Sequence, residues 1–285
     1  MKVLVTGAAG MLARDLVPCL QTRGHETSAP PENDFDITDI AAIRRWASSL
    51  EPHVIINCAA YTKVDQAEKE ERLATIINGL AVQNLCLVCQ EKDIPLVHFS
   101  TDYVFDGTKE GAYTIYDRPN PINAYGRSKL LGEKYVLWLL NKLYLIRTSW
   151  LFGVYGSNFV ETMLNLAKKQ RQVSVVSDQR GCPTWTQHLS ETVVSLIESG
   201  RYGVYHATNS GSTTWFEYAR EIFRSAGTGT EVLPIRSDQY LTAATRPKNS
   251  VLDSFPLPEV TKTVMPSWQE AIQQYLSLRK EKARA

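Results

Sequence analysis

A glycine-rich turn close to the N-terminus constrains the fold of this chain more than any other feature of its sequence. Gly7, Gly10 and Ala13 are spaced three residues apart, after the apolar run 2–5 and at the start of an amphipathic stretch. Glycine permits the tight turn and lets backbone N–H groups approach a pyrophosphate at a helix N-terminus, where the helix dipole favours an anion. The turn therefore predicts a dinucleotide-binding βαβ unit. An ordinary glycine turn is the alternative, and alanine at the third position weakens the match only a little.

Short β-branched runs alternate with amphipathic stretches through the first half of the chain, as they do in βαβ units with a parallel sheet. The expected strands cover residues 2–5, 26–29, 53–57, 95–100 and 144–148, and the expected helices cover 11–23, 39–49, 65–92 and 123–141. Thr38 and Asp65 are expected N-caps, and Gly24 is expected to end the first helix. This pattern predicts an α/β fold, with a Rossmann-like, doubly wound parallel sheet in residues 1–150.

The second half of the chain is less regular. Helices are expected at 158–169, 187–199, 213–226 and 267–279, and short apolar runs lie at 173–176, 204–206 and 232–235. Proline is frequent between residues 234 and 266, which favours loops. We expect residues 151–285 to form mainly a smaller C-terminal substrate-binding lobe, with 185–207 returning to the dinucleotide-binding domain.

The charges of the chain are nearly balanced, with a net charge of +1. Such a chain has no overall field to attract nucleic acid or an anionic membrane surface, so neither partner is expected. The sequence has no run of about 18 consecutive apolar residues, so no membrane span is expected. The first apolar run is too short for a signal peptide. A cytoplasmic location is therefore expected.

Five cysteines are scattered along the chain, and this odd number is unlike the disulfide framework of a small secreted domain. Cys86 and Cys89 have the CxxC spacing, but no second pair and no nearby histidine completes a metal site. Buried, reduced thiols are favoured over redox or zinc chemistry, and no metal site is predicted.

Tyr125 and Lys129 stand four residues apart, hence on one helical face. A neighbouring ammonium stabilises a phenolate and lowers the pKa of the phenol, so the tyrosine could protonate an alkoxide while the lysine also binds the nicotinamide ribose. Alone this spacing is more often a surface pair, but its place after the glycine turn and four strands favours catalysis. Thr101, at the carboxyl end of an expected strand, can donate to the substrate carbonyl or merely close an ST-turn.

A second turn, residues 57–62, follows the third expected strand and consists mainly of small residues. It lies at the carboxyl edge of the predicted sheet, so we expect its backbone to pass close to the cofactor, although tight packing could require the same residues. Asp36 and Ile37 are expected to flank the adenine, unless Asp36 is only a solvated loop acid. The expected cofactor contacts are Gly7, Gly10, Met11, Leu12, Asp36, Ile37, Cys58, Ala59, Ala60, Tyr61, Tyr125 and Lys129.

The end of the second expected strand normally decides between NADH and NADPH, through an acid on the ribose or a base on the 2′-phosphate. Residues 28–33 place neither charge plainly there. The expected cofactor is therefore NADPH or NADH, with the preference undecided.

A set of motifs resembles the dTDP-4-dehydrorhamnose reductase family over residues 2 to about 250. The motifs are Gly7-x-x-Gly10, residues 57–62, Val64-Asp65, residues 100–107, Tyr125-x-x-x-Lys129, residues 147–150 and Arg246-Pro247-x-Asn249-Ser250. The resemblance implies reduction of the C4 ketone of dTDP-4-dehydro-L-rhamnose to dTDP-L-rhamnose with NADPH or NADH, the last step in making that sugar nucleotide. It maps Thr101, Tyr125 and Lys129 onto the catalytic triad, and it also allows a homodimer.

The resemblance further implies a nucleotide-sugar pocket lined by Val64, Thr101, Asp102, Tyr103, Trp150, Asn158 and Arg246. For three of these residues a structural role is the alternative. Trp150 could pack on the sugar or in the core, and Asn158 could bind substrate or cap a helix. Arg246 could hold the diphosphate with its planar fork or be an ordinary surface arginine.

The residues beside Thr101 help to choose the reaction. A 4,6-dehydratase needs a carboxylic acid and base there, typically Asp-Glu, whereas this chain has Asp102 and Tyr103. Simple reduction is therefore favoured. The alternatives are a related nucleotide-sugar reductase or epimerase, and a non-catalytic, NADP-binding regulatory subunit resembling that of methionine adenosyltransferase.

Overall fold

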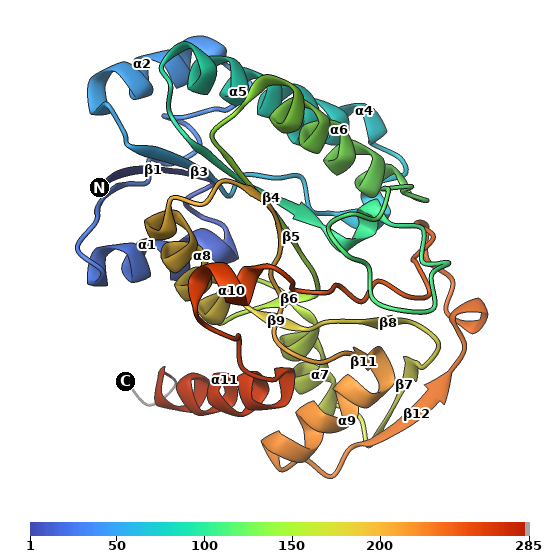
Figure 1. Ribbon diagram of the computed structural model, residues 1–285. Coiled ribbons are helices and arrows are strands. Elements are labelled where there is room, and N and C mark those ends of the chain that lie inside the picture. Colours follow the sequence, from blue (N-terminus) through green and yellow to red (C-terminus); the bar gives the residue numbers. More distant parts are fainter. Residues whose placement is uncertain (283–285) are drawn as a thin grey trace.

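Six parallel strands form the central sheet of the computed structural model, which describes residues 1–282 (Figure 1). The strands are β1 (Lys2–Thr6), β2 (Glu26–Ser28), β3 (Val54–Asn57), β4 (Leu96–Thr101), β5 (Leu143–Thr148) and β10 (Gly203–His206). Along the sheet they follow the order β10-β5-β4-β3-β1-β2, and every pairing is parallel. The chain winds outward from β1 in both directions, which confirms the predicted Rossmann-like, doubly wound α/β fold.

Helices cover both faces of this sheet. Successive residues of β1 point to opposite sides, so the strand contributes side chains to two hydrophobic cores. Val3 and Val5 pack with Leu16 and Val193 in one hydrophobic core, whereas Leu4 packs with Ile43 in the other. The helices of the first core are α1 (Met11–Thr22) and α8 (Thr186–Ser199), and those of the second are α2 (Ile40–Leu50), α5 (Ala81–Glu91) and α6 (Ala124–Leu139). The segment after residue 185 thus supplies a helix beside α1 and, in β10, the edge strand of the sheet.

The single helix expected over 65–92 is interrupted. The structure divides it into α3 (Val64–Ala67), α4 (Glu71–Thr75), the π-helical turn η1 (Ile76–Leu80) and α5. Lys63, not Asp65, stands at the N-cap of α3, and Asp65 bonds elsewhere in the molecule. Thr38 is likewise not a cap, since α2 begins after Asp39, whose carboxylate accepts from Ala41 N at 2.8 Å. Gly24 follows the end of α1 at a φ of 78°, as predicted.

The helical run 71–91 is long and apolar enough, by length and composition alone, to cross a membrane. Half of its most apolar window is buried inside the protein, and α4, η1 and α5 all pack against α6. This is the environment of a core helix in a globular domain.

A second group of elements lies beyond the carboxyl edge of the sheet (Figure 1). Its larger elements are α7 (Phe159–Ala167), β7 (Gln172–Val176), α9 (Trp215–Ala226), β12 (Glu231–Ile235) and α11 (Trp268–Lys282). Its short elements are β6 (Leu151–Phe152), β8 (Arg180–Gly181), β9 (Thr184–Trp185), β11 (Thr213–Thr214) and η3 (Ser237–Gln239). The short helix α10 (Leu257–Thr261) instead packs against α8 in the first hydrophobic core. The expected helix at 213–226 starts only at Trp215, because Thr213 and Thr214 pair with β8 and Thr214 then caps α9.

Candidate active site

The turn after β1 needs glycine for two independent reasons. Gly7 has a φ of 66°, and a Cβ atom at this position would lie 2.6 Å from Ala59 N and 2.7 Å from the carbonyl carbon of Cys58. The turns after β1 and β3 therefore press directly against each other. Gly10 stands at the N-cap of α1 and supplies no side-chain acceptor, so the N–H groups of the first turn keep their capacity to bind an anion. These features fit the pyrophosphate of a dinucleotide.

A buried polar network holds these two turns in register. Thr6 Oγ1 donates to Asn57 Oδ1 at 2.6 Å, and the same oxygen accepts from Ala59 N at 3.2 Å. The Asn57 amide also meets His98 Nδ1 on β4 at 3.1 Å. Burial and the nearby charge of Lys129 hold the pKa of His98 well below its ordinary value, so the ring is neutral.

The other residues expected near the cofactor have varied surroundings. Leu12 and Ile37 belong to the two hydrophobic cores, whereas Met11 lies at the start of α1 close to Gly153. Asp36 is exposed, and its carboxylate accepts from the backbone N–H and the hydroxyl of Thr38, each at 2.8 Å. These hydrogen bonds of Asp36 are those of an acid that stabilises its own loop.

Asn78 in the π-helical turn ties the second turn to α6. Its amide oxygen accepts from Tyr61 N at 2.9 Å, and its amide nitrogen donates to Tyr61 O at 3.0 Å and to Ser128 Oγ at 2.9 Å. Ser128 in turn donates to the carbonyl oxygen of Tyr125 at 2.7 Å. Asn78 was not predicted from the sequence, in which the available signal was an asparagine within an apolar helical pattern; the structure shows that it is buried.

Three side chains predicted for the reacting end of the substrate come together at the end of β4. Thr101 is the last residue of that strand, and its hydroxyl lies beside the phenol of Tyr125. The ring of Tyr103 meets the ring of Tyr125 edge to face, with centroids 6.1 Å apart. Asn123 caps α6 by accepting from Gly126 N at 2.7 Å, and this fixes the helix turn that carries Tyr125.

Lys129 lies one turn further along α6, and its side chain is buried. Burial lowers the pKa of Lys129 to about 8 and raises the pKa of Tyr125 to about 12. The Lys129 ammonium was expected to lower the pKa of Tyr125, and for this structure that expectation is wrong. Desolvation is the largest cause for both groups, and the Thr101 hydroxyl acts on the pKa of Tyr125 in the opposite direction.

Four further residues were expected to line the sugar pocket, and three of them have partners in the structure. Trp150 stacks on Trp215, with ring centroids 3.4 Å apart and an interplanar angle of 6°. Asn158 caps α7, because its oxygen accepts from Glu161 N at 3.1 Å and its amide donates to Gly153 O at 2.8 Å. For both residues the observed contacts are those of the structural alternative. Val64 is the half-buried first residue of α3, and Arg246 is paired with Asp65.

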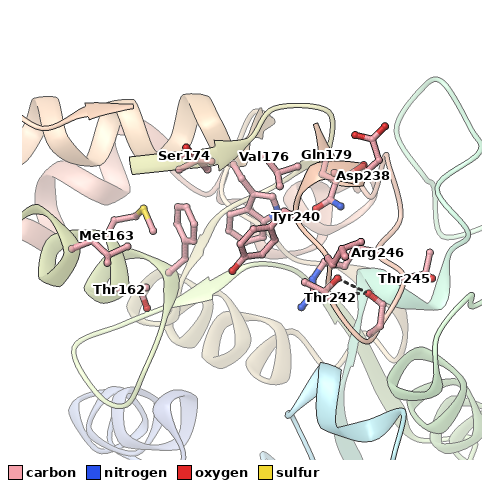
Figure 2. A pocket seen from close by; sticks show the side chains of 17 residues that line it. Thr162, Met163, Ser174, Val176, Gln179, Asp238, Tyr240, Thr242, Thr245 and Arg246 are labelled. Atoms are coloured by element: carbon pink, nitrogen blue, oxygen red, sulfur yellow. Dashed lines mark hydrogen bonds between the residues drawn. The ribbon is translucent and has the colours of Figure 1, made fainter. Parts of the chain in front are cut away.

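A cavity of about 590 Å³ opens beside Arg246 (Figure 2). It lies among α7, β7, α9 and the segment 237–246, and Phe159, Trp215 and Tyr240 give it an aromatic lining. Figure 2 shows Gln179 and Arg246 at one end of it, with Met163 and Thr162 at its other end. Of the lining residues, only Arg246 was predicted as a site residue.

Comparison with known proteins shows the family to which this chain belongs. The family described as the RmlD substrate binding domain matches residues 1–280. A dTDP-4-dehydrorhamnose reductase of Mycolicibacterium smegmatis is 38% identical, over 95% of this chain and 84% of the relative. The chain belongs to the dTDP-4-dehydrorhamnose reductase family.

Two further relatives show how far the likeness to this reductase family extends. A dTDP-4-keto-6-deoxy-D-glucose reductase of Streptomyces niveus is 42% identical, over 96% of this chain and 96% of the relative. The crystal structure of a dTDP-4-dehydrorhamnose reductase from Bacillus anthracis in complex with NADP is 41% identical, with a TM-score of 0.94, covering 97% of this chain and 99% of that one. The resemblance inferred from the motifs is thus confirmed over nearly the whole chain.

The CxxC cysteines and the possible metal ligands lie outside the motifs of the reductase family. Cys86 and Cys89 are buried free thiols, as expected, and burial raises the pKa of Cys86 to about 12. Within residues 1–282, no three His, Cys, Asp or Glu side chains are grouped as metal ligands.

Proposed function

We propose that this chain reduces the C4 ketone of dTDP-4-dehydro-L-rhamnose to dTDP-L-rhamnose with NADPH or NADH. The observation that carries the proposal is the grouping of Thr101, Tyr125 and Lys129 at the carboxyl edge of the sheet, directly beside the turns after β1 and β3. The relatives also support the proposal, because they are named as reductases of dTDP-4-keto sugars.

The residues of this chain have distinct roles in that reaction. The backbone around Gly7 and Gly10 would hold the pyrophosphate of the cofactor, and the bound nicotinamide supplies the hydride. Thr101 and Tyr125 would hold the ketone oxygen between their hydroxyl groups, and Tyr125 would protonate that oxygen as the ketone becomes an alcohol. Lys129 would place a positive charge behind this proton transfer while binding the nicotinamide ribose.

The cavity beside Arg246 suits the nucleotide half of the substrate. Its volume of about 590 Å³ and its aromatic lining fit a nucleoside, since pockets for small ligands are mostly apolar with a few polar groups. Arg246 lies at the cavity edge nearest Tyr103, where a diphosphate would connect the nucleoside to a sugar placed at Tyr125. Val64, Asp102 and Tyr103 remain proposed sugar contacts, whereas the bonds of Trp150 and Asn158 point to structural roles.

The alternatives predict different behaviour. A non-catalytic regulatory subunit has no need of a buried tyrosine and lysine beside a threonine, so the intact triad argues against it. The identity of the sugar is more open, because the relative from Streptomyces niveus is named for a different dTDP-4-keto sugar. We propose that the protein acts in the cytoplasm, and the homodimer expected from the resemblance stays a prediction.

The test is oxidation of NADPH and of NADH by the purified protein, with dTDP-4-dehydro-L-rhamnose and dTDP-4-keto-6-deoxy-D-glucose as separate substrates. We expect turnover with the first sugar nucleotide, and the ratio of rates with the two cofactors settles their preference. Turnover of the second sugar alone would reassign the substrate. No oxidation with either sugar, together with co-purification of another enzyme, would favour the regulatory subunit.

A further inference from the structure

We propose that Asp65 is the positioning residue that holds Arg246 at the boundary between the nucleotide cavity and the catalytic tyrosines. The inference rests on the proposed function, because it assigns Arg246 to the diphosphate of a nucleotide-sugar substrate. It adds a residue from the opposite side of the site, separated from Arg246 by 181 positions in the chain.

Asp65 engages Arg246 through both carboxylate oxygens. Arg246 Nη2 donates to Asp65 Oδ2 at 2.7 Å, and Arg246 Nη1 donates to Asp65 Oδ1 at 3.1 Å. This two-point contact fixes the plane of the guanidinium as well as its position. The hydrogen bond and charge of Arg246 hold the pKa of the Asp65 carboxyl below its ordinary value, so Asp65 is ionised at neutral pH.

The same carboxylate also fixes the backbone that carries Arg246. Asp65 Oδ1 accepts from Ala244 N at 3.0 Å, and Arg246 Nη1 donates back to Ala244 O at 3.1 Å. Asn123, at the N-cap of α6, donates to Thr245 O at 2.9 Å. The segment 244–246 is therefore fastened at two points to the part of the molecule that presents Tyr125.

The contact leaves one edge of the guanidinium for a ligand. Nη1 uses its two hydrogens on Asp65 and Ala244, and Nη2 uses one of its hydrogens on Asp65. An arginine held by a carboxylate at its end can still offer its Nε side to an anion. The Tyr103 side chain contacts the guanidinium and the ring of Tyr125, so Arg246 is oriented relative to the reacting end of the site.

The Asp65–Arg246 pair differs from a simple surface ion pair in the exposed fractions of its two side chains. The Arg246 side chain is 21% exposed and lines the cavity, whereas Asp65 is 46% exposed and approaches from α3, outside the cavity lining. Exposed ion pairs contribute little to stability. The expected consequence of losing Asp65 is therefore weaker binding of the diphosphate, with a small change in folding.

The test uses dTDP as the probe, because its binding does not require turnover. Dissociation constants for dTDP and NADPH are measured for the wild type, Asp65→Asn, Arg246→Ala and the double variant. We expect Asp65→Asn to raise the dissociation constant for dTDP roughly tenfold, with that for NADPH unchanged within about twofold. In the Arg246→Ala background, Asp65→Asn should change dTDP binding by less than about twofold, because Asp65 acts through Arg246.

Glu71→Gln is the matched control, since Glu71 makes an exposed ion pair with Arg127 on the neighbouring helices and should leave dTDP binding unchanged. If Asp65→Asn does not fold, the charge swap Asp65→Arg with Arg246→Asp keeps an ion pair and should still bind dTDP weakly. Recovery of dTDP binding in the swap, or equal effects of Asp65→Asn in both backgrounds, would overturn the proposal. A wild type that binds dTDP but shows no turnover would contradict the proposed function and leave this inference standing.

Discussion

Thr101 Oγ1 donates a hydrogen bond to Asp102 Oδ1 at 3.1 Å, and within residues 1–282 the other oxygen of that carboxyl has no hydrogen-bond partner. Burial raises the pKa of Asp102 to about 7. A protonated Asp102 can donate where the ionised form can only accept, which would free the Thr101 hydrogen for the ketone oxygen of a substrate. The protonation of this buried carboxyl therefore bears on both stability and site chemistry.

Asp102→Asn tests the stability effect. The folded-state pKa of about 7 lies above the ordinary value of 3.8, so between these values the folded protein binds more protons than the unfolded chain. The contribution of Asp102 to stability therefore falls as the pH rises through this window. Relative to Asp102→Asn, the wild type should lose on the order of a few kcal/mol of unfolding free energy from about pH 4 to about pH 7, measured by urea denaturation. A difference independent of pH would contradict the raised pKa.

Gly7→Ala tests the contact between the two turns. The substitution combines a φ of 66° with a Cβ only 2.6 Å from Ala59 N, so the backbone must shift. We expect a loss of about 1–3 kcal/mol in stability and weaker NADPH binding, measured by thermal unfolding and titration. Gly111→Ala is the control, since no atom lies within 4 Å of a Cβ built there. Equal effects of the two substitutions would exclude the close approach as the cause.

Glu133→Gln tests the buried ion pair between Glu133 of α6 and Arg147 of β5. Glu133 accepts from Arg147 at 2.9 Å and 2.7 Å, and both side chains are almost fully buried. Removing one charge leaves the other uncompensated, so we expect a loss of about 3–5 kcal/mol in unfolding free energy. The exposed pair of Glu71 and Arg127 is the comparison, and Glu71→Gln should cost about 1 kcal/mol or less. Similar losses for both variants would show that burial does not set the contribution of the pair.

Tyr125→Phe tests the proton donor. The phenyl ring can keep its edge-to-face contact with Tyr103, so folding and NADPH binding should persist. Without the hydroxyl, steady-state turnover should fall by about 10²–10⁴-fold. Tyr116→Phe is the control, since that side chain is 78% exposed, and it should leave the rate unchanged. A Tyr125→Phe variant with wild-type turnover would remove Tyr125 from the chemistry.

The parts of the fold that follow from local pattern were predictable from the sequence. The sequence pattern located five of the six strands to within about two residues, and it marked the sixth, β10, as a short apolar run. For β3, β4 and β5 the signal was strong because burial on both faces requires continuous apolar residues. The four-residue spacing of Tyr125 and Lys129 placed both on one face of α6, since that spacing is a property of any helix.

The parts that depend on long-range contacts were not predictable in this way. Asp65 matched a helix cap by sequence, yet its carboxylate bonds to a residue 181 positions away. Trp150 carries no local sign that it would stack on Trp215. The cavity beside Arg246 is built from four separate segments, so no single motif reports it. The lowered pKa of Lys129 arises from its burial, which spacing alone does not reveal.

The most direct test of the central claim is the fate of the hydride. Wild-type protein is incubated with dTDP-4-dehydro-L-rhamnose and NADPH carrying deuterium at the transferred position of the nicotinamide, and the product is analysed by NMR. We expect dTDP-L-rhamnose with deuterium at C4, formed far more slowly by Tyr125→Phe. Deuterium at another carbon, or no transfer to the sugar by the wild type, would contradict this claim.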